Sequence, residues 1–254
     1  MSSPKFLISA FVFISFLILI SCGIPQVPEG ANAKETFEFA TKHYEDDNYE
    51  AAKLGFDRIK LQYPASIYAD DAQYYLAEIN YSQSKYILAA FNYSTLRRVY
   101  PRSDYARLAL FKTAMSYYNL SPSFDRDQEY TFKAIKTFSE FQAQYPGDSL
   151  YSEAGEYIDE LRNKLAYRDY FTAGLYRKIR SSKSSLVYYQ SVIDNYPDTD
   201  YLEDAYVGKI ETLDYLGRES EAIREIKKYR DLFPNGELKD KVSTIEANLG
   251  KKEE

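Results

Sequence analysis

The chain has 254 residues, 45% of them hydrophobic, and a formal net charge of −6. An acidic chain lacks the basic field that nucleic-acid binders normally carry, so we expect no nucleic-acid partner. One cysteine and one histidine exclude an internal disulfide and most metal sites built from His and Cys. We therefore expect no metal, no cofactor and no catalytic residue, because the abundant carboxylates lie at turns and helix starts, where capping explains them.

The first 22 residues have the pattern of a bacterial lipoprotein signal. Phe6 to Ile20 are apolar apart from two serines, and this length suits a signal-peptide core better than a membrane span of about 20 residues. The sequence Leu19-Ile20-Ser21-Cys22-Gly23 resembles the site where cleavage leaves a cysteine that carries diacylglycerol, and Cys22 is the single cysteine. We expect a signal peptide over residues 1–21, covalent diacylglycerol and an acyl chain at Cys22, and a lipid-anchored tether over residues 22–32. A short transmembrane anchor is the alternative.

From residue 48 onward, one helical pattern ends five times in a proline. Apolar residues at steps of 3, 4, 3 and 4 mark one face of an α-helix, and the proline stops the helix. A small residue one turn into each copy lets another helix approach closely. The prolines are Pro64, Pro101, Pro146, Pro197 and Pro234, and the small residues are Ala52, Ala89, Ala134, Ser185 and Ala222.

Each proline is followed by a second helical segment. Serine or threonine residues soon after the prolines, or their Asp neighbours, are expected to be N-caps: Ser66, Ser103, Ser149 and Thr199. Large aromatic residues seven positions apart recur every 37 residues, and we expect them to wedge the two helices of a unit together: Phe37 and Tyr44, Tyr74 and Tyr81, Phe111 and Tyr118. The combined pattern resembles the tetratricopeptide repeat.

The repeat predicts an all-α fold, a tetratricopeptide-repeat superhelix of about five helical hairpins without a sheet. The array is expected over residues 33–249, with a C-terminal cap helix near 237–249 and a charged tail over 250–254. Two insertions are expected, one in the loop at 119–128 and one that lengthens the first helix of the fourth unit. The units are expected at 33–64, 65–101, 102–146, 147–197 and 198–234.

The lipoprotein signal, the repeats and the sequence Asp125-Arg126-Asp127 together resemble the BamD family of outer-membrane β-barrel assembly lipoproteins. The family's D-R-D is followed at fixed spacing by Ala, Phe and Tyr-Pro, which here are Ala134, Phe138, Tyr145 and Pro146. The chain departs from the family at Gln128, where a proline is common, and at Arg180 and Tyr188, where a glycine and an arginine are usual.

The Asp125-Arg126-Asp127 motif has two interpretations. In the structural one, Asp127 caps the next helix and Arg126 forms a bidentate ion pair that folds the inserted loop onto the array. In the other, the motif contacts a partner directly. We favour the structural role.

Two surfaces are candidate partner-binding sites. Counting from the aromatic residues places a peptide-binding groove on the first helices of the units, at Glu38, Lys42, Tyr75, Ile79, Lys112 and Ser116. Basic residues that cluster within residues 176–185 could dock an acidic partner domain: Arg177, Lys178, Arg180 and Lys183. The alternative for both surfaces is an ordinary solvated helix face, and for the basic residues also a helix end whose dipole favours cations.

The family resemblance implies a non-catalytic scaffold that is lipid-anchored at the periplasmic face of the outer membrane. It implies two kinds of partner, a BamA-like barrel protein held through its periplasmic domains, and unfolded outer-membrane proteins. Two rival classes are a SusD-like glycan-binding lipoprotein, disfavoured because the chain has no Trp, and a repeat lipoprotein associated with peptidoglycan or cell division.

Overall fold

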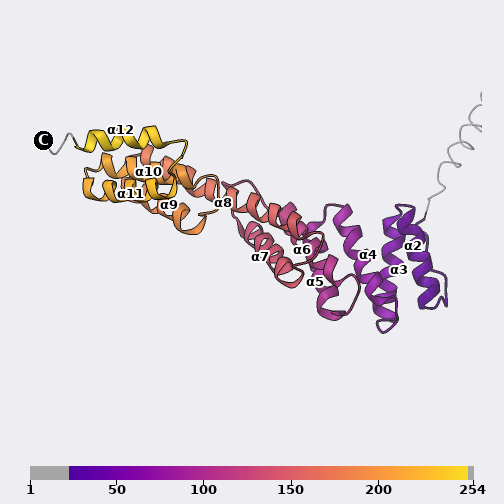
Figure 1. Ribbon diagram of the computed structural model, residues 1–254. Helices are drawn as coiled ribbons and strands as arrows, with labels where there is room; N and C mark the ends of the chain where they lie inside the picture. The colour runs from indigo at the N-terminus through magenta and orange to yellow at the C-terminus, as the bar shows by residue number, and fades with distance from the viewer. Residues whose placement is uncertain (1–22, 251–254) are drawn as a thin grey trace, which may run out of the picture. The chain divides into compact units, whose positions relative to one another are not determined.

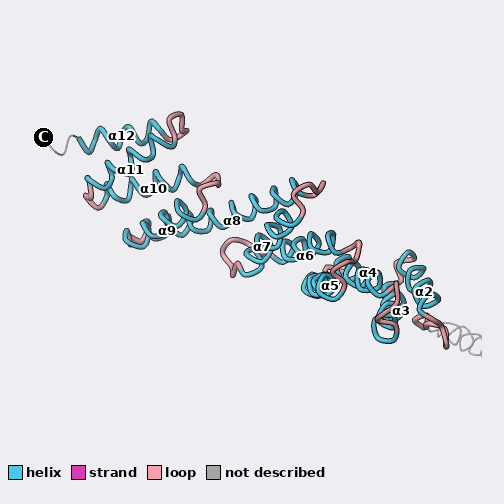
Figure 2. The backbone as a smooth tube through the Cα atoms, turned by 60° about the horizontal axis from the view of Figure 1, so that its bottom comes forward, coloured by secondary structure: helices cyan, strands magenta, loops and turns pink. Residues whose placement is uncertain are grey.

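The computed structural model describes residues 23–250, which form eleven helices and no strand (Figures 1 and 2). The predicted all-α fold is therefore confirmed. The predicted unit ends near residues 64, 101, 146, 197 and 234 fall in the loops that follow α3, α5, α7, α9 and α11. The helices are α2 (Ala33–Glu45), α3 (Tyr49–Gln62), α4 (Ala69–Ser82), α5 (Tyr86–Val99), α6 (Ala106–Leu120), α7 (Glu129–Gln144), α8 (Tyr151–Lys178), α9 (Ser182–Asn195), α10 (Leu202–Tyr215), α11 (Glu219–Leu232) and α12 (Lys239–Gly250).

The described chain divides into two compact units, residues 23–79 and residues 80–250. In the first unit α2 packs on α3. A capping box starts α2: the Asn32 side chain accepts a hydrogen bond from the Glu35 backbone N–H, and the Glu35 carboxylate accepts one from the Asn32 N–H, both at 3.0 Å. This reciprocal pair fixes the point where α2 begins.

An aromatic cluster holds the first unit together. The Phe37 ring of α2 stacks on Tyr68 at 4.8 Å between centroids, and the Tyr75 ring of α4 stacks on Phe56 of α3 at 5.1 Å. Tyr44 meets Tyr75 edge-on at 4.9 Å. Towards α3, Phe37 meets Phe56 edge-on at 6.1 Å and Tyr44 lies 5.9 Å from Tyr49, so both rings wedge the two helices of the first hairpin together as predicted. Such ring pairs add about 0.5–1.5 kcal/mol each beyond the area they bury.

In the second unit each helix from α5 to α11 packs on the next one along the chain, and α12 contacts both α10 and α11. The small residue of every repeat is buried, and so are the large residues four and seven positions after it. Burying each large side chain stabilises the fold by about 1.5–3 kcal/mol. The large residues are Phe56, Ile59, Tyr93, Leu96, Phe138, Phe141, Tyr189, Val192, Ile226 and Tyr229.

The proline of each repeat ends the helix two residues earlier, as predicted. The residue before each proline is the C-cap, with φ between −133° and −122°, and its N–H still donates to the carbonyl four residues back. The steric bulk of the proline ring disfavours the α-helical region for the residue that precedes it. The helix therefore cannot continue through that position.

The predicted N-caps are wrong for α6, α8 and α10. The N-cap residues of α6, α8 and α10 are Tyr105, Leu150 and Tyr201, and none makes a side-chain capping bond. The polar residues act two or three positions earlier, where backbone turns such as that from the Ala106 N–H to the Ser103 carbonyl, 2.9 Å, lead into the helix. Satisfying the helix end by a turn removes the need for a side-chain cap.

Each of four helix-to-helix turns contains one residue in the left-handed conformation. Asp47, Ser84, Arg180 and Gly217 have φ of 55°, 58°, 59° and 67°. In each turn the left-handed residue donates to the carbonyl three positions back, and the next residue donates to the carbonyl five positions back. This is a Schellman motif, in which glycine is the preferred residue because it has no Cβ. The hairpin of α6 and α7 has the inserted loop in place of this turn.

Two single substitutions, one at Ser84 and one at Gly217, test this turn geometry. We expect Ser84→Gly to stabilise the chain by about 0.5–1 kcal/mol and Gly217→Ser to destabilise it by a similar amount, because a side chain in the left-handed region carries a steric cost. Urea denaturation followed by circular dichroism measures both. Equal shifts of the same sign in the two variants would contradict the shared motif.

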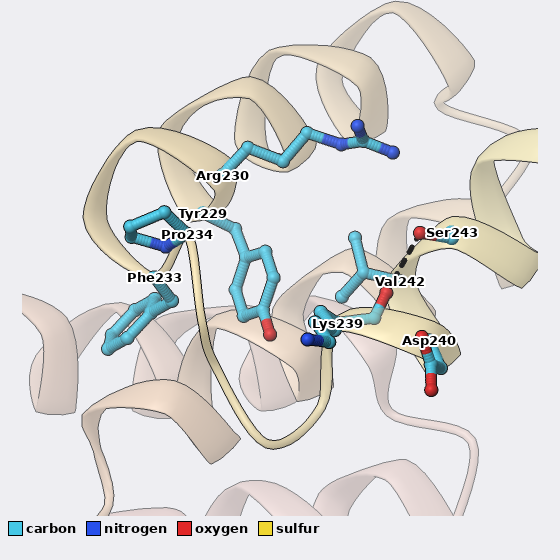
Figure 3. Close-up of a pocket in the computed structure, with 8 residues that line it drawn as sticks. All are labelled: Tyr229, Arg230, Phe233, Pro234, Lys239, Asp240, Val242 and Ser243. Carbon is cyan, nitrogen blue, oxygen red and sulfur yellow. Dashed lines mark hydrogen bonds between the residues drawn. The ribbon is translucent and has the colours of Figure 1, made fainter.

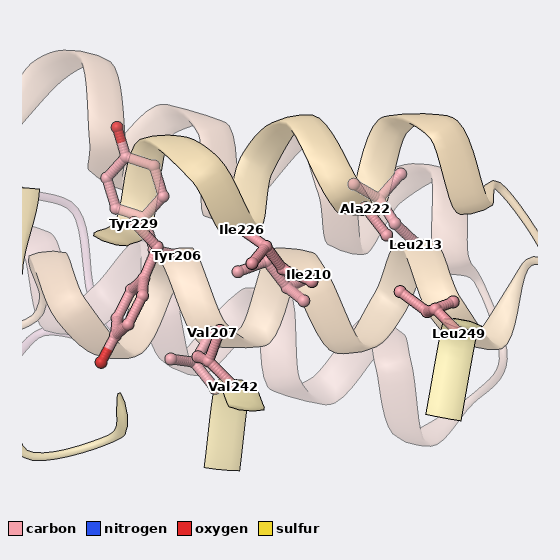
Figure 4. Close-up of a cluster of buried hydrophobic side chains, with 9 residues drawn as sticks. All are labelled: Tyr206, Val207, Ile210, Leu213, Ala222, Ile226, Tyr229, Val242 and Leu249. Carbon is pink, nitrogen blue, oxygen red and sulfur yellow. The ribbon is translucent and has the colours of Figure 1, made fainter. Parts of the chain in front are cut away.

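The end of the second unit is closed by α12. Figure 4 shows Val242 and Leu249 of α12 lying against α10 and α11, whose side chains Val207, Ile210 and Ile226 are buried beside them.

The fourth helical repeat has the predicted long first helix, since α8 has 28 residues. Because α8 is long, it contacts α7, α9 and α10, and its length positions the two surfaces considered next.

Candidate partner-binding site

The inserted loop at residues 121–128 is fastened to α8. The Phe124 ring lies 4.7 Å from the Tyr167 ring and 5.2 Å from the Phe171 ring, both on α8. The Lys164 ammonium donates to the Pro122 carbonyl at 3.1 Å and to the Ser121 hydroxyl. Burial lowers the pKa of Lys164, because water is removed from its charge. The loop is therefore held by an aromatic contact and by a half-buried ammonium.

The Asp125-Arg126-Asp127 motif lies in this loop and is stabilised mainly by local hydrogen bonds. The Asp125 carboxylate accepts from the Ser123 hydroxyl at 2.5 Å, and this bond lowers the pKa of Asp125. The Asp127 carboxylate accepts from the Glu129 backbone N–H at 2.9 Å, so it satisfies the start of α7 although the N-cap itself is Gln128.

The predicted ion pair of Arg126 is not formed. Its side chain is exposed and pairs with no carboxylate among residues 23–250. Gln128 does the bridging instead, because its buried side-chain amide donates to the carbonyls of Ser123 (2.8 Å) and Arg126 (2.9 Å). Its carbonyl oxygen accepts from the Thr131 hydroxyl at 2.7 Å. Sequence reasoning missed Gln128 as a structural residue, and its only signal was the departure from proline.

The basic segment lies at the turn between α8 and α9. Arg177 forms an ion pair with Glu211 of α10, so its charge is neutralised within the chain. Lys178, Arg180 and Lys183 are exposed and form no ion pair with a described carboxylate. Three of the four predicted cations are thus available to a partner at one corner of the second unit, which we call the basic corner (Lys178, Arg180 and Lys183).

A groove with a volume of about 670 Å³ begins at Lys183 and runs between α9, α10 and the start of α11. Leu186, Val187 and Leu213 contribute its apolar surface, and Val187 is 65% exposed. Two cations on its rim, Lys209 and Arg218, are neutralised by glutamates of α11 at 3.0 and 2.6 Å. The groove therefore combines an apolar wall with the unpaired ammonium of Lys183.

The predicted groove on the first helices needs correction at two residues, and a third, Tyr75, is half-buried. Ile79 and Ser116 are fully buried, and the Ser116 hydroxyl donates to the Lys112 carbonyl of its own helix. Tyr75 belongs to the aromatic cluster of the first unit. The first helices are covered on more than one side, so positions counted as groove-facing from one aromatic residue become part of the core.

The remaining predicted groove residues keep exposed or half-buried charges. Glu38 is exposed and lies 3.7 Å from Lys34 on the same helix, and Lys42 is exposed in the last turn of α2. The Lys112 ammonium lies 4.8 Å from the centre of the Tyr81 ring, a cation–π contact. Their role in binding a peptide stays a prediction.

A small pocket of about 280 Å³ lies where α11 turns into α12 (Figure 3). Three of its polar side chains have partners within the chain: the Tyr229 hydroxyl donates to Glu203 at 2.7 Å, Arg230 pairs with Glu246, and the Ser243 hydroxyl donates to the Lys239 carbonyl at 2.9 Å. Because the bonds of Tyr229 and Arg230 link α11 to α10 and to α12, the pocket is part of the terminal packing.

The predicted signal peptide, Cys22 and the charged tail beyond Gly250 lie outside the described residues. Within residues 23–250, no helix is both long enough and apolar enough to cross a bilayer. In the same range, no three His, Cys, Asp or Glu side chains cluster in a way that could hold a metal ion.

The fold and its exposed surfaces define a class, that of all-helical repeat proteins of the tetratricopeptide type. A family model described as outer membrane lipoprotein, YfiO, matches residues 29–229. The chain belongs to the YfiO family of outer membrane lipoproteins.

Two relatives and one solved structure extend the comparison. A candidate outer membrane protein assembly factor BamD of Aquifex aeolicus is 25% identical over 240 residues, which are 93% of this chain and 77% of the relative. The outer membrane protein assembly factor BamD of Rickettsia prowazekii is 24% identical over 191 residues, 74% of each chain. A tetratricopeptide-repeat protein of Thermus thermophilus matches with a TM-score of 0.36 and 16% identity, over 84% of this chain and 98% of its own.

Proposed function

We propose that this chain is a non-catalytic scaffold of outer-membrane protein assembly, tethered by lipid at Cys22 and facing the periplasm. Family membership and the two BamD relatives support the assembly role. Diacylglycerol and a further acyl chain on one cysteine would anchor the chain stably, because two or more chains are needed for lasting membrane attachment. Its partners would be a BamA-like barrel protein and unfolded outer-membrane proteins.

The observation that carries the proposal is the basic corner. Lys178, Arg180 and Lys183 are unpaired among the described residues of a chain whose net charge is −6. The apolar groove begins at the same point, since Lys183 lines it. An acidic domain of the barrel protein would meet three cations and, beside them, an apolar wall. Charges at the edge of such an interface steer association, and buried apolar residues at its centre supply most of the affinity.

Charge reversal of the basic corner tests the docking role. We expect the triple variant Lys178→Glu, Arg180→Glu and Lys183→Glu to lose the barrel protein in affinity purification from solubilised outer membranes, because attraction becomes repulsion. The matched control, Lys85→Glu, Arg102→Glu and Lys227→Glu, changes the net charge equally at exposed sites elsewhere.

The control should recover the barrel protein as well as the unchanged chain does. Undiminished recovery by the basic-corner variant would refute this docking site. Failure of the unchanged chain to recover any barrel protein with periplasmic domains would refute the assembly role itself. Recovery of glycan-binding or peptidoglycan-associated proteins in its place would favour the rival classes.

A further inference from the structure

A third hollow, of about 250 Å³, is formed by side chains of three helices, α5, α6 and α7. Three cations line it: Arg97 from α5, and Lys133 and Lys136 from α7. One carboxylate, Glu140, also lines it and pairs with Arg97 at 2.8 Å. The cavity therefore carries surplus positive charge within an acidic protein. We call it the α5–α7 pocket.

The two lysines of the pocket differ in their ion pairs. Lys133 pairs with Glu129 of its own helix at 2.6 Å, and its ammonium lies 5.1 and 5.8 Å from the ring centres of Tyr130 and Tyr117. These contacts hold the Lys133 side chain at the pocket. Lys136 is exposed and forms no ion pair with any carboxylate of the described chain. Its charge is available to an anion.

The pocket also offers neutral hydrogen-bond donors. The hydroxyls of Ser94 and Tyr117 line it and make no hydrogen bond to another described residue. Arg97 uses one terminal nitrogen for Glu140 and Gln144, which leaves its other N–H groups to donate. An anion entering the pocket would thus meet donors from three helices, and charged donors make the stronger hydrogen bonds.

We propose that the α5–α7 pocket binds a phosphate group, either as free phosphate or as the headgroup of a phospholipid. Inorganic phosphate and a phosphate monoester such as the phosphatidic acid headgroup present three or more terminal acceptor oxygens, which suit a ring of ammonium, guanidinium and hydroxyl donors better than the two oxygens of a carboxylate. Phe91 lies one turn before Ser94 on α5 and is 62% exposed. The apolar part of a phospholipid would find this ring next to the pocket.

The two sources are separated by titrating the full chain, solubilised in detergent, with inorganic phosphate and with dihexanoyl phosphatidic acid. Isothermal titration calorimetry at low salt measures both. We expect the double variant Lys133→Gln and Lys136→Gln to weaken binding about tenfold or more, because it removes two charged hydrogen-bond donors, which bind an anion more strongly than neutral donors do. The control Lys85→Gln and Lys227→Gln removes two charges elsewhere and should bind as the unchanged chain does.

Comparable affinity for both probes would identify free phosphate as sufficient, whereas tenfold tighter binding of the lipid would identify a headgroup site. No binding of either probe by the unchanged chain overturns the proposal. Wild-type affinity in the double variant also overturns it. If the loss of Lys133 perturbs α7, the single variant Lys136→Gln decides, since Lys136 has no ion pair to lose.

Discussion

Phe138→Ala is expected to lower the free energy of unfolding by about 3–5 kcal/mol, the usual cost of removing a buried phenyl ring from a core. Phe138 lies on α7 with no exposed surface. Its ring stacks on Tyr157 of α8 at 5.2 Å and meets Phe111 of α6 edge-on at 5.6 Å. One side chain thus joins three consecutive helices, and its loss leaves a cavity that none of them can fill alone.

Phe132→Ala is the matched control, because Phe132 lies on the same helix and is 50% exposed. We expect its cost to stay within about 0.5 kcal/mol, as for most surface substitutions. Urea denaturation monitored by circular dichroism compares the two variants. Similar losses of stability in both variants would mean that the ring of Phe138 does not hold α6, α7 and α8 together.

Gly208→Ala is expected to destabilise the chain by about 1–3 kcal/mol, the typical cost of overpacking a core. A Cβ at Gly208 on α10 would lie 2.4 Å from Cζ and 2.5 Å from Cε1 of Tyr189 on α9. Tyr189 is buried, and its ring lies 6.0 Å from that of Tyr170 on α8. The ring therefore has little room to move, and α9 and α10 would have to separate.

Gly174→Ala is the control and should shift stability in the opposite direction. Gly174 lies within α8, and a Cβ there would meet no atom within 4 Å. Alanine should therefore gain about 0.5–1 kcal/mol from its better helix propensity. Thermal melts of the two variants test the pair, since 1 kcal/mol corresponds to about 2–4 °C in a chain of this size. A stabilised Gly208→Ala variant would contradict the close approach of α9 and α10.

Short-range patterns in the sequence were enough to predict the helices and the packed face of each repeat. The buried positions Ala134, Phe138 and Phe141 follow from one helical period counted back from Pro146, and the proline itself ends the helix. Such rules act within a few residues, so they operate in any context. The length of α8 was predictable for the same reason, because its segment contains no proline.

Side chains that contact distant parts of the chain could not be assigned in this way. Arg177 was expected at a docking surface, yet α10 brings Glu211 to it. Ile79 and Ser116 were expected in a groove, yet they are buried. Gln128 was noted only as a departure from a family pattern, yet its amide ties the inserted loop together. In each case the role of the side chain depends on a neighbour that is distant in the sequence, or on a loop whose residues follow no periodic pattern.

By itself, the sequence of this protein determined that it folds as consecutive α-helices, where the second helix of each repeat stops, and which stripe of that helix is apolar. The tertiary structure alone decided which charges remain free, and so where the basic corner and the α5–α7 pocket lie. The physical reason is range: helix periodicity, small-residue spacing and proline sterics are local, whereas burial and ion pairing depend on which helices come to lie against one another.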